Sequence, residues 1–329
     1  MSIRTMLIMI YGEDSFRVQE KVQQMKQAFL EKFDGSGMNL AEFPSKENDK
    51  LESADILQAI CSYPFLGLKR LVIVRGLIGS VKKADEAIWL DGMSRMPDST
   101  ITILWEDGSS QSVQKKKFFQ ALKQFKDVHT YSLDLLVGAA LKQWISERCE
   151  QRGSRIDEPA LHELVLRVGS DLWNMYQEIE KLSAYAQGTS ISSDLVQQLV
   201  HASFESRIFE FMDAVSKRQR KKTVQLLEDE RASGSDDHYL LTMLGRQVRI
   251  LLSTRSYLDL FPQAKSADIA QAIDIHPFVA QKAIGQARAF QLAELQSAHD
   301  LLFLYDVKIK TGRMEAGIAM DLVVNSLLG

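Results

Sequence analysis

The stretch Tyr63-Pro64-Phe65-Leu66-Gly67-Leu68-Lys69-Arg70-Leu71-Val72-Ile73-Val74 decides how the first third of this chain folds. Leu71–Val74 is a short apolar, β-branched run, which is typical of a fully buried strand. Pro64 has no N–H and disfavours helix in the residue before it, so a preceding helix is expected to end near Tyr63. The apolar pair Phe65-Leu66 then lies between helix and strand, where it either caps the core or projects as an anchor for a partner.

Strands and helices alternate on both sides of this stretch. Met6–Tyr11 is an apolar run that ends at Gly12, and Asp14 or Ser15 is placed to cap a following helix. Further strands are expected at 38–43, 100–105 and 128–132, and further helices at 51–61, 82–93 and 115–125. This alternation at short spacing predicts a parallel α/β domain over residues 1–136.

After Leu133 the strand patterns stop and the rest of the chain is expected to be all-α. Residues 137–203 predict a small helical domain, with helices at 137–151, 159–168, 171–186 and 193–201. Residues 204–329 predict a second domain of longer helices, at 207–217, 220–233, 237–261, 277–290, 292–311 and 314–328.

Composition excludes several classes of protein. A net charge of −3 over 329 residues is unlike a polycation built to bind nucleic acid, so any such contact must come from local patches. Two cysteines, without a pairing pattern or metal-ligand spacing, fit a reducing cytosol. No apolar run approaches 18 residues, so we expect no membrane span and a cytoplasmic protein.

The position after the first strand is where a nucleotide-binding protein carries its phosphate loop. Here Gly12 is followed by Glu13 and Asp14, and no Gly-Lys dipeptide occurs in the chain. A phosphate cradle needs free backbone N–H groups and a lysine, and the two acids repel an anion. We therefore expect no P-loop, although an active ATPase remains an alternative.

No catalytic or metal constellation stands out elsewhere. Glu106-Asp107 follows a strand, where paired acids can hold a metal and water, but without a phosphate cradle a solvated strand end is expected. Two basic clusters, Lys115-Lys116-Lys117 and the run at 217–222, are either solvated helix faces or contacts to DNA phosphates.

Several short motifs, taken in order, resemble those of the delta subunits of the bacterial DNA polymerase III clamp loader. The amino-terminal strand runs into Tyr11-Gly12-Glu13-Asp14, and Pro64-Phe65-Leu66 leads to Arg70-Leu71-Val72 as in the family pattern P-F-[FL]-x-x-[KR]-R-L-V. Further matches lie at 115–122, 208–214, 244–249 and 276–278. The resemblance covers essentially the whole chain.

This resemblance implies three domains: an AAA+-like α/β domain that has lost its ATP site, a helical lid at 137–203, and a helical collar at 204–329 for oligomerisation. It further implies that Phe65 and Leu66, flanked by Pro64, enter a pocket on the beta sliding clamp. The helix that carries them then opens one interface of the clamp ring during DNA replication.

The resemblance also implies the partners and the division of labour. ATP is bound by the motor (gamma/tau) subunits, the delta-prime subunit completes the loader, and primed DNA is held by the complex, with Lys115, Lys116 and Lys117 as candidate contacts. Polymerase chemistry belongs to another subunit, so no catalysis and no cofactor are expected here. The alternatives are an active AAA+ ATPase, and the delta-prime or scaffold subunit of the same loader.

Overall fold

The computed structural model describes residues 6–43, 53–201 and 204–328. The chain divides into two compact units, Met1–Leu136 and Val137–Gly329. Within the described residues, no helix is both long enough and apolar enough to cross a bilayer.

The first unit is built on a five-stranded sheet in which every neighbouring pair is parallel. The strand order is β2-β3-β4-β1-β5. The strands span Met6–Gly12 (β1), Leu40–Phe43 (β2), Arg70–Arg75 (β3), Thr100–Asp107 (β4) and Val128–Ser132 (β5). The predicted parallel α/β fold is therefore confirmed in the described part of this unit.

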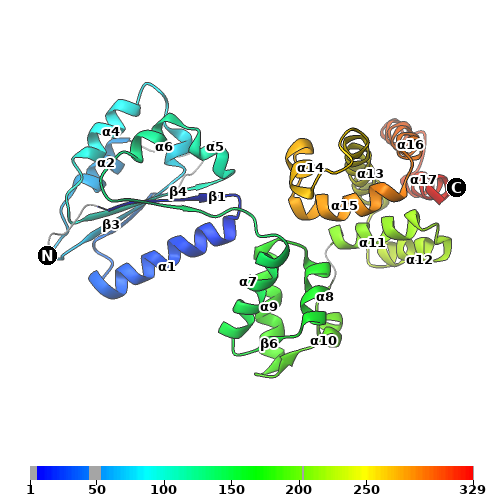
Figure 1. Cartoon of the computed structure of the whole chain (residues 1–329), viewed down its shortest axis with the longest axis horizontal. Coiled ribbons are helices and arrows are strands. Elements are labelled where there is room, and N and C mark those ends of the chain that lie inside the picture. Colours follow the sequence, from blue (N-terminus) through cyan, green and yellow to red (C-terminus); the bar gives the residue numbers. More distant parts are fainter. Residues whose placement is uncertain (1–5, 44–52, 202–203, 329) are drawn as a thin grey trace. The chain divides into compact units, whose positions relative to one another are not determined.

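Helices cover both faces of this sheet, as Figure 1 shows. α1 (Ser15–Phe33) lies on one face. On the other face lie α2 (Ser53–Cys61), α4 (Glu86–Ser94), α5 (Ser110–Gln114) and α6 (Lys117–Leu122). Successive side chains of β1 point to opposite faces of the sheet, because side chains alternate along a strand. Leu7 and Met9 pack in the cluster with Phe118 and Phe119, whereas Ile8 packs in the cluster on the α1 side.

Two of the expected helices in this unit start later than expected, and each is preceded by a separate short helix. The helix expected at 82–93 is α4 (Glu86–Ser94), and α3 (Leu77–Ser80) comes before it and ends where Val81 has extended backbone. The helix expected at 115–125 is α6 (Lys117–Leu122), and α5 (Ser110–Gln114) comes before it, with Lys116 extended between them at ψ 132°. Val113 of α5 packs in the same apolar cluster as Phe118, Phe119 and Leu122 of α6.

The second unit begins with four helices and a short strand pair. The helices are α7 (Gly138–Gln151), α8 (Glu158–Val168), α9 (Leu172–Ala186) and α10 (Ser193–Leu199). The expectation that strands stop after Leu133 is wrong, since β6 (Arg155–Ile156) pairs in parallel with β7 (Ser190–Ile191). Each strand has only two residues, too few for a recognisable alternating pattern.

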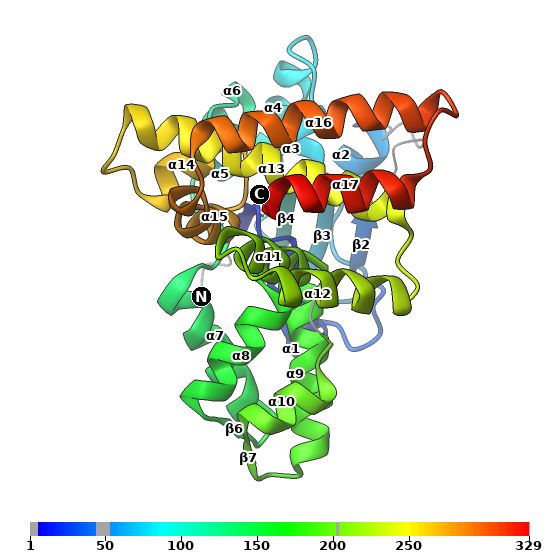
Figure 2. The same ribbon diagram turned by 90° about the vertical axis from the view of Figure 1, so that its right-hand side faces the viewer.

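The remainder of this unit is helical, with α13 packed against its neighbours (Figure 2). The helices are α11 (Phe204–Ser216), α12 (Arg220–Ala232), α13 (Asp237–Leu260), α14 (Ser266–Ile273), α15 (Pro277–Ala289), α16 (Leu292–Lys310) and α17 (Ala316–Leu328). The sequence patterns missed α14, which has only eight residues and buries only Ile269 and Ala270.

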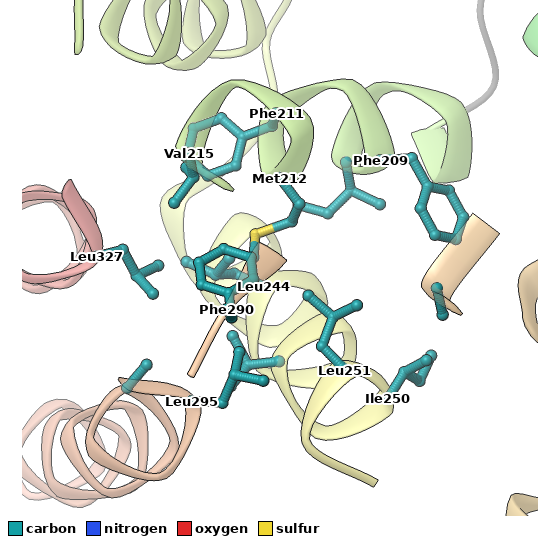
Figure 3. Close-up of a cluster of buried hydrophobic side chains, with 14 of the residues drawn as sticks. Phe209, Phe211, Met212, Val215, Leu244, Ile250, Leu251, Phe290, Leu295 and Leu327 are labelled. Atoms are coloured by element: carbon teal, nitrogen blue, oxygen red, sulfur yellow. The ribbon is translucent and has the colours of Figure 1, made fainter. Parts of the chain in front are cut away.

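One apolar core joins these helices. Figure 3 shows Met212 of α11, Leu244 of α13, Leu295 of α16 and Leu327 of α17 converging on it, with Phe290 filling the space beside α15. Within this cluster the buried amide of Gln286 is fully used. It accepts a hydrogen bond from Gln247 and donates to the Phe209 carbonyl and the Asp213 carboxylate, so a polar network also ties α11, α13 and α15 together.

Candidate functional site

The loop between α2 and β3 presents apolar side chains to solvent. Phe65 is 60% exposed and Leu66 93% exposed, and their neighbours Tyr63 and Leu68 are exposed as well. Pro64 is half-buried. Phe65 and Leu66 thus lie outside the apolar clusters of this unit, and the first of the two alternatives, packing in the core, does not describe them. We call residues 63–68 the tip.

The backbone of the tip is held although its side chains are free. The Phe65 N–H donates to Asn39 Oδ1 at 2.6 Å, and Asn39 Nδ2 donates to the Phe65 carbonyl at 3.1 Å. One side-chain amide therefore satisfies both polar groups of one backbone residue. The next residue, Leu66, has left-handed backbone with φ +47°, so the chain turns sharply there.

Asn39 is itself fixed in place. It is 3% exposed, its N–H donates to Asp34 Oδ2 at 2.6 Å, and its carbonyl accepts from the Leu71 N–H at 2.8 Å. Asp34 ends α1, and its other oxygen accepts from the Ser36 hydroxyl at 2.7 Å. The Ser36 hydroxyl and the Asn39 N–H favour the ionised form of this carboxylate and hold its pKa below the usual value.

The turn from β1 into α1 lies at the other end of the sheet, where the strands have their carboxyl ends. Only Glu13 and Asp14 separate Gly12 from the start of α1. The Asp14 N–H donates to the Leu133 carbonyl at 3.1 Å, and the Asp14 carboxylate accepts from the Arg17 N–H at 3.0 Å. A Cβ on Gly12 would stand 2.0 Å from that same Leu133 oxygen, so the β5–α7 segment closes directly over the turn.

Glu106 departs from the expected solvated strand end. It is 8% exposed and accepts a hydrogen bond from the Gly79 N–H at 2.7 Å. Burial raises the pKa of Glu106, although the Gly79 N–H and the Lys116 ammonium oppose the shift. Asp107 is more accessible and pairs with Arg75 at 2.7 Å. Both acids therefore make contacts within the fold, Glu106 with Gly79 and Asp107 with Arg75. Within the described ranges, no group of His, Cys, Asp and Glu is suited to hold a metal ion.

The structure separates the three lysines at 115–117. Lys115 ends α5 and Lys117 begins α6, and both are exposed. Lys116 lies between the helices and donates to the Gly79 carbonyl at 3.2 Å. The expected solvated helix face is therefore a helix junction, in which Lys116 has a structural contact and the flanking lysines face solvent.

The second basic cluster is similarly divided. Arg218 lies in the turn between α11 and α12 and contacts the Leu327 carbonyl and Glu294, while Lys222 pairs with Glu210 at 2.8 Å. Part of its charge is thus neutralised within the second unit.

Comparisons with known proteins agree with this architecture. The family profile described as "DNA polymerase III, delta subunit" matches residues 9–132, and the profile "DNA polymerase III delta subunit, C-terminal domain" matches residues 205–327. The chain belongs to the DNA polymerase III delta subunit family.

Among curated relatives of this delta chain is the DNA polymerase III subunit delta of Bacillus subtilis, 26% identical over 97% of this chain and 92% of the relative. The subunit delta of Escherichia coli is 25% identical over 36% of this chain and 34% of the relative. Among solved structures, the Bacillus subtilis DNA clamp loader delta protein has a TM-score of 0.75 at 24% identity and covers 98% of this chain and 95% of that one. The delta family fold therefore extends over both units.

Sequence reasoning found the exposed pair of this delta chain but missed the residues that hold it. Asn39 falls within the strand expected at 38–43, but the structure places it just before β2, where its amide reaches the chain entering β3. Its contact with the Asp34 carboxylate is not part of any local pattern. A buried Asn has no local sequence signature, because its partner is 26 positions away.

We predict that Asp34→Asn lowers the free energy of unfolding at neutral pH, and that the difference from wild type disappears in acid. The folded-state pKa of Asp34 is below its ordinary value of 3.8. Its stabilising contribution is therefore complete above pH 3.8 and is lost as the pH falls through the folded value. Urea titrations from pH 7 downward measure the difference. Asp300→Asn, at a side chain 86% exposed, is the control, and a constant difference at every pH would contradict the assignment.

Proposed function

We propose that this chain is the delta subunit of a DNA polymerase III clamp loader, and that the tip binds the beta sliding clamp and opens one interface of its ring. The observation that supports the proposal is the exposure of Phe65 and Leu66, at 60% and 93%, on a backbone that is hydrogen-bonded to a buried residue. Family membership makes the sliding clamp the partner to test first.

The physical basis is burial of apolar side chains in a pocket. Truncating an aromatic or aliphatic anchor at the centre of an interface commonly costs about 2 kcal/mol or more of binding free energy. Pro64 restricts the backbone just before the pair, which lowers the entropy lost on binding. Ring opening requires that the clamp bind the tip more tightly in its open state, since a ligand shifts an equilibrium only through differential affinity.

The remaining partners follow from the same proposal. Motor (gamma/tau) and delta-prime subunits bind the carboxy-terminal helical region, for which α16 and α17 offer the exposed apolar side chains Phe303, Val307 and Ile318. Large apolar surfaces suit permanent interfaces. The chain is a component of the polymerase holoenzyme without catalysis of its own.

We expect Phe65→Ala combined with Leu66→Ala to weaken clamp binding at least about 30-fold, because two exposed anchors are lost. Calorimetric titration of the purified chain with the clamp from the same organism measures this. Leu260→Ala with Phe261→Ala is a matched control, since that Leu-Phe pair is also exposed but lies in the second unit. Unchanged affinity, or loss of helical circular dichroism in the tip variant, would reject the anchor.

We further propose that the chain binds no ATP, and that nucleotide is held by the motor subunits. The two-residue turn between Gly12 and α1 is shorter than a phosphate loop, and the Asp14 N–H is already bonded to Leu133. Purified chain is expected to give no ATP turnover and no saturable binding of a fluorescent ATP analogue. ATP turnover by the purified chain would instead support the alternative of an active AAA+ ATPase.

We propose that Lys115 and Lys117 contact primed DNA within the assembled loader, with Lys116 contributing less because it bonds Gly79. Charge reversal at Lys115 and Lys117 is expected to weaken DNA binding by the loader and to lower its salt dependence by about one unit of slope per lost phosphate contact. Charge reversal at Lys123 and Lys126, exposed at the other end of α6, is the control. An unchanged salt slope would rule the contact out.

A further inference from the structure

We propose that Asn39 is a positioning residue for the tip: its side-chain amide holds the backbone of Phe65 so that the apolar pair is presented ready to bind. This inference rests on the proposed function of the tip. Asn39 itself is only 3% exposed, so its side chain is not available for direct contact with a partner. Its effect on binding therefore passes through Phe65.

The geometry gives Asn39 control over a single residue. Its Oδ1 accepts the Phe65 N–H at 2.6 Å while its Nδ2 donates to the Phe65 carbonyl at 3.1 Å. Both backbone polar groups of Phe65 face inward, which leaves the aromatic ring to face solvent. Without these two bonds the exposed loop from 63 to 68 has fewer restraints, because its apolar side chains lie outside the hydrophobic clusters that the sheet and its helices form in this unit.

Asn39 transmits the rigidity of the sheet to the tip. Its N–H is bonded to Asp34 at the end of α1, and its carbonyl accepts from Leu71 at the start of β3. The backbone of Asn39 is therefore hydrogen-bonded on both its N–H and its carbonyl, which fixes the position of its side-chain amide. The Phe65 backbone, which is bonded to that amide, is held in place with it. We call these contacts, from Asp34 through Asn39 to Phe65, the tip latch.

Gly67 supplies an independent test of the latch. A Cβ at Gly67 would lie 2.8 Å from Asn39 Nδ2, closer than real contacts allow. The backbone of Gly67 is outside the left-handed range, so an alanine is tolerated there except for this collision. Gly67→Ala therefore disturbs the latch while every apolar side chain of the tip is kept.

Loss of the latch lowers the fraction of molecules that are ready to bind. The apparent Kd rises by the inverse of that fraction, and an ordered backbone residue freed in the unbound state must be ordered again on binding. We expect Asn39→Ala and Gly67→Ala each to raise the Kd for the clamp about tenfold. We expect the double variant to bind no more weakly than Asn39→Ala, since the alanine at 67 then meets no amide.

The experiment is a calorimetric titration of the full chain with the clamp, using wild type, both single variants and the double variant. Gly35→Ala is the matched control, because a Cβ there meets nothing within 4 Å. Circular dichroism checks that each variant is folded. Hydrogen exchange of the Phe65 amide, measured without clamp, is expected to be slow in wild type and faster in both single variants.

Each outcome is decisive. If Phe65→Ala with Leu66→Ala loses binding but Asn39→Ala and Gly67→Ala bind like wild type, the latch is wrong and the proposed function stands. Additive losses in the double variant, or unchanged Phe65 exchange, also overturn the latch. If wild type does not bind the clamp, the proposed function fails and the positioning role fails with it. If Asn39→Ala does not fold, Gly67→Ala alone decides between these results.

Discussion

The parallel ladder of the sheet is the constraint on which the first unit depends. Because all strands run in the same direction, their amino ends lie at one end of the sheet and their carboxyl ends at the other. Each connection therefore leaves from the carboxyl ends and returns to the amino ends. The tip and Asn39 lie at the amino ends of the strands, where β2 and β3 begin. Gly12, Glu106 and Lys116 lie at the carboxyl ends, where β1 and β4 finish. A strand of six residues spans about 20 Å. The tip and the junction at Lys116 are thus separated by about the length of the sheet.

Much of this fold was predictable from the sequence because its three central strands, β1, β3 and β4, are buried on both faces. Continuous apolar runs such as 71–74 and 6–11 stand out, and Asp14 caps α1 as its position indicates. The failures have a common physical origin. The extended backbone of Lys116 delays the start of α6, and β6 and β7 depend on a partner distant in sequence. Local periodicity cannot register either effect.

The tip illustrates the same limit at the level of function. The pattern around Pro64 placed an apolar pair between a helix and a strand. The backbone of that pair is held by Asn39, which the pairing of β2 with β3 brings close to it. At the carboxyl ends of the strands, the sequence shows two acids after Gly12, and the structure shows how their backbone is held. The Leu133 carbonyl accepts a hydrogen bond from the Asp14 N–H and leaves no room for a side chain at 12.

Leu66 has a further consequence for the balance between stability and binding. A left-handed backbone at a residue with a branched side chain is unfavourable by roughly 1–2 kcal/mol, and glycine or asparagine is the usual occupant of such a turn. At φ +47° the most exposed leucine of the tip is also a strained one. A glycine at this position would relax the turn but delete the side chain. The tip is therefore a place where thermostability and recognition oppose each other, and substitutions selected only for heat resistance would tend to erode it.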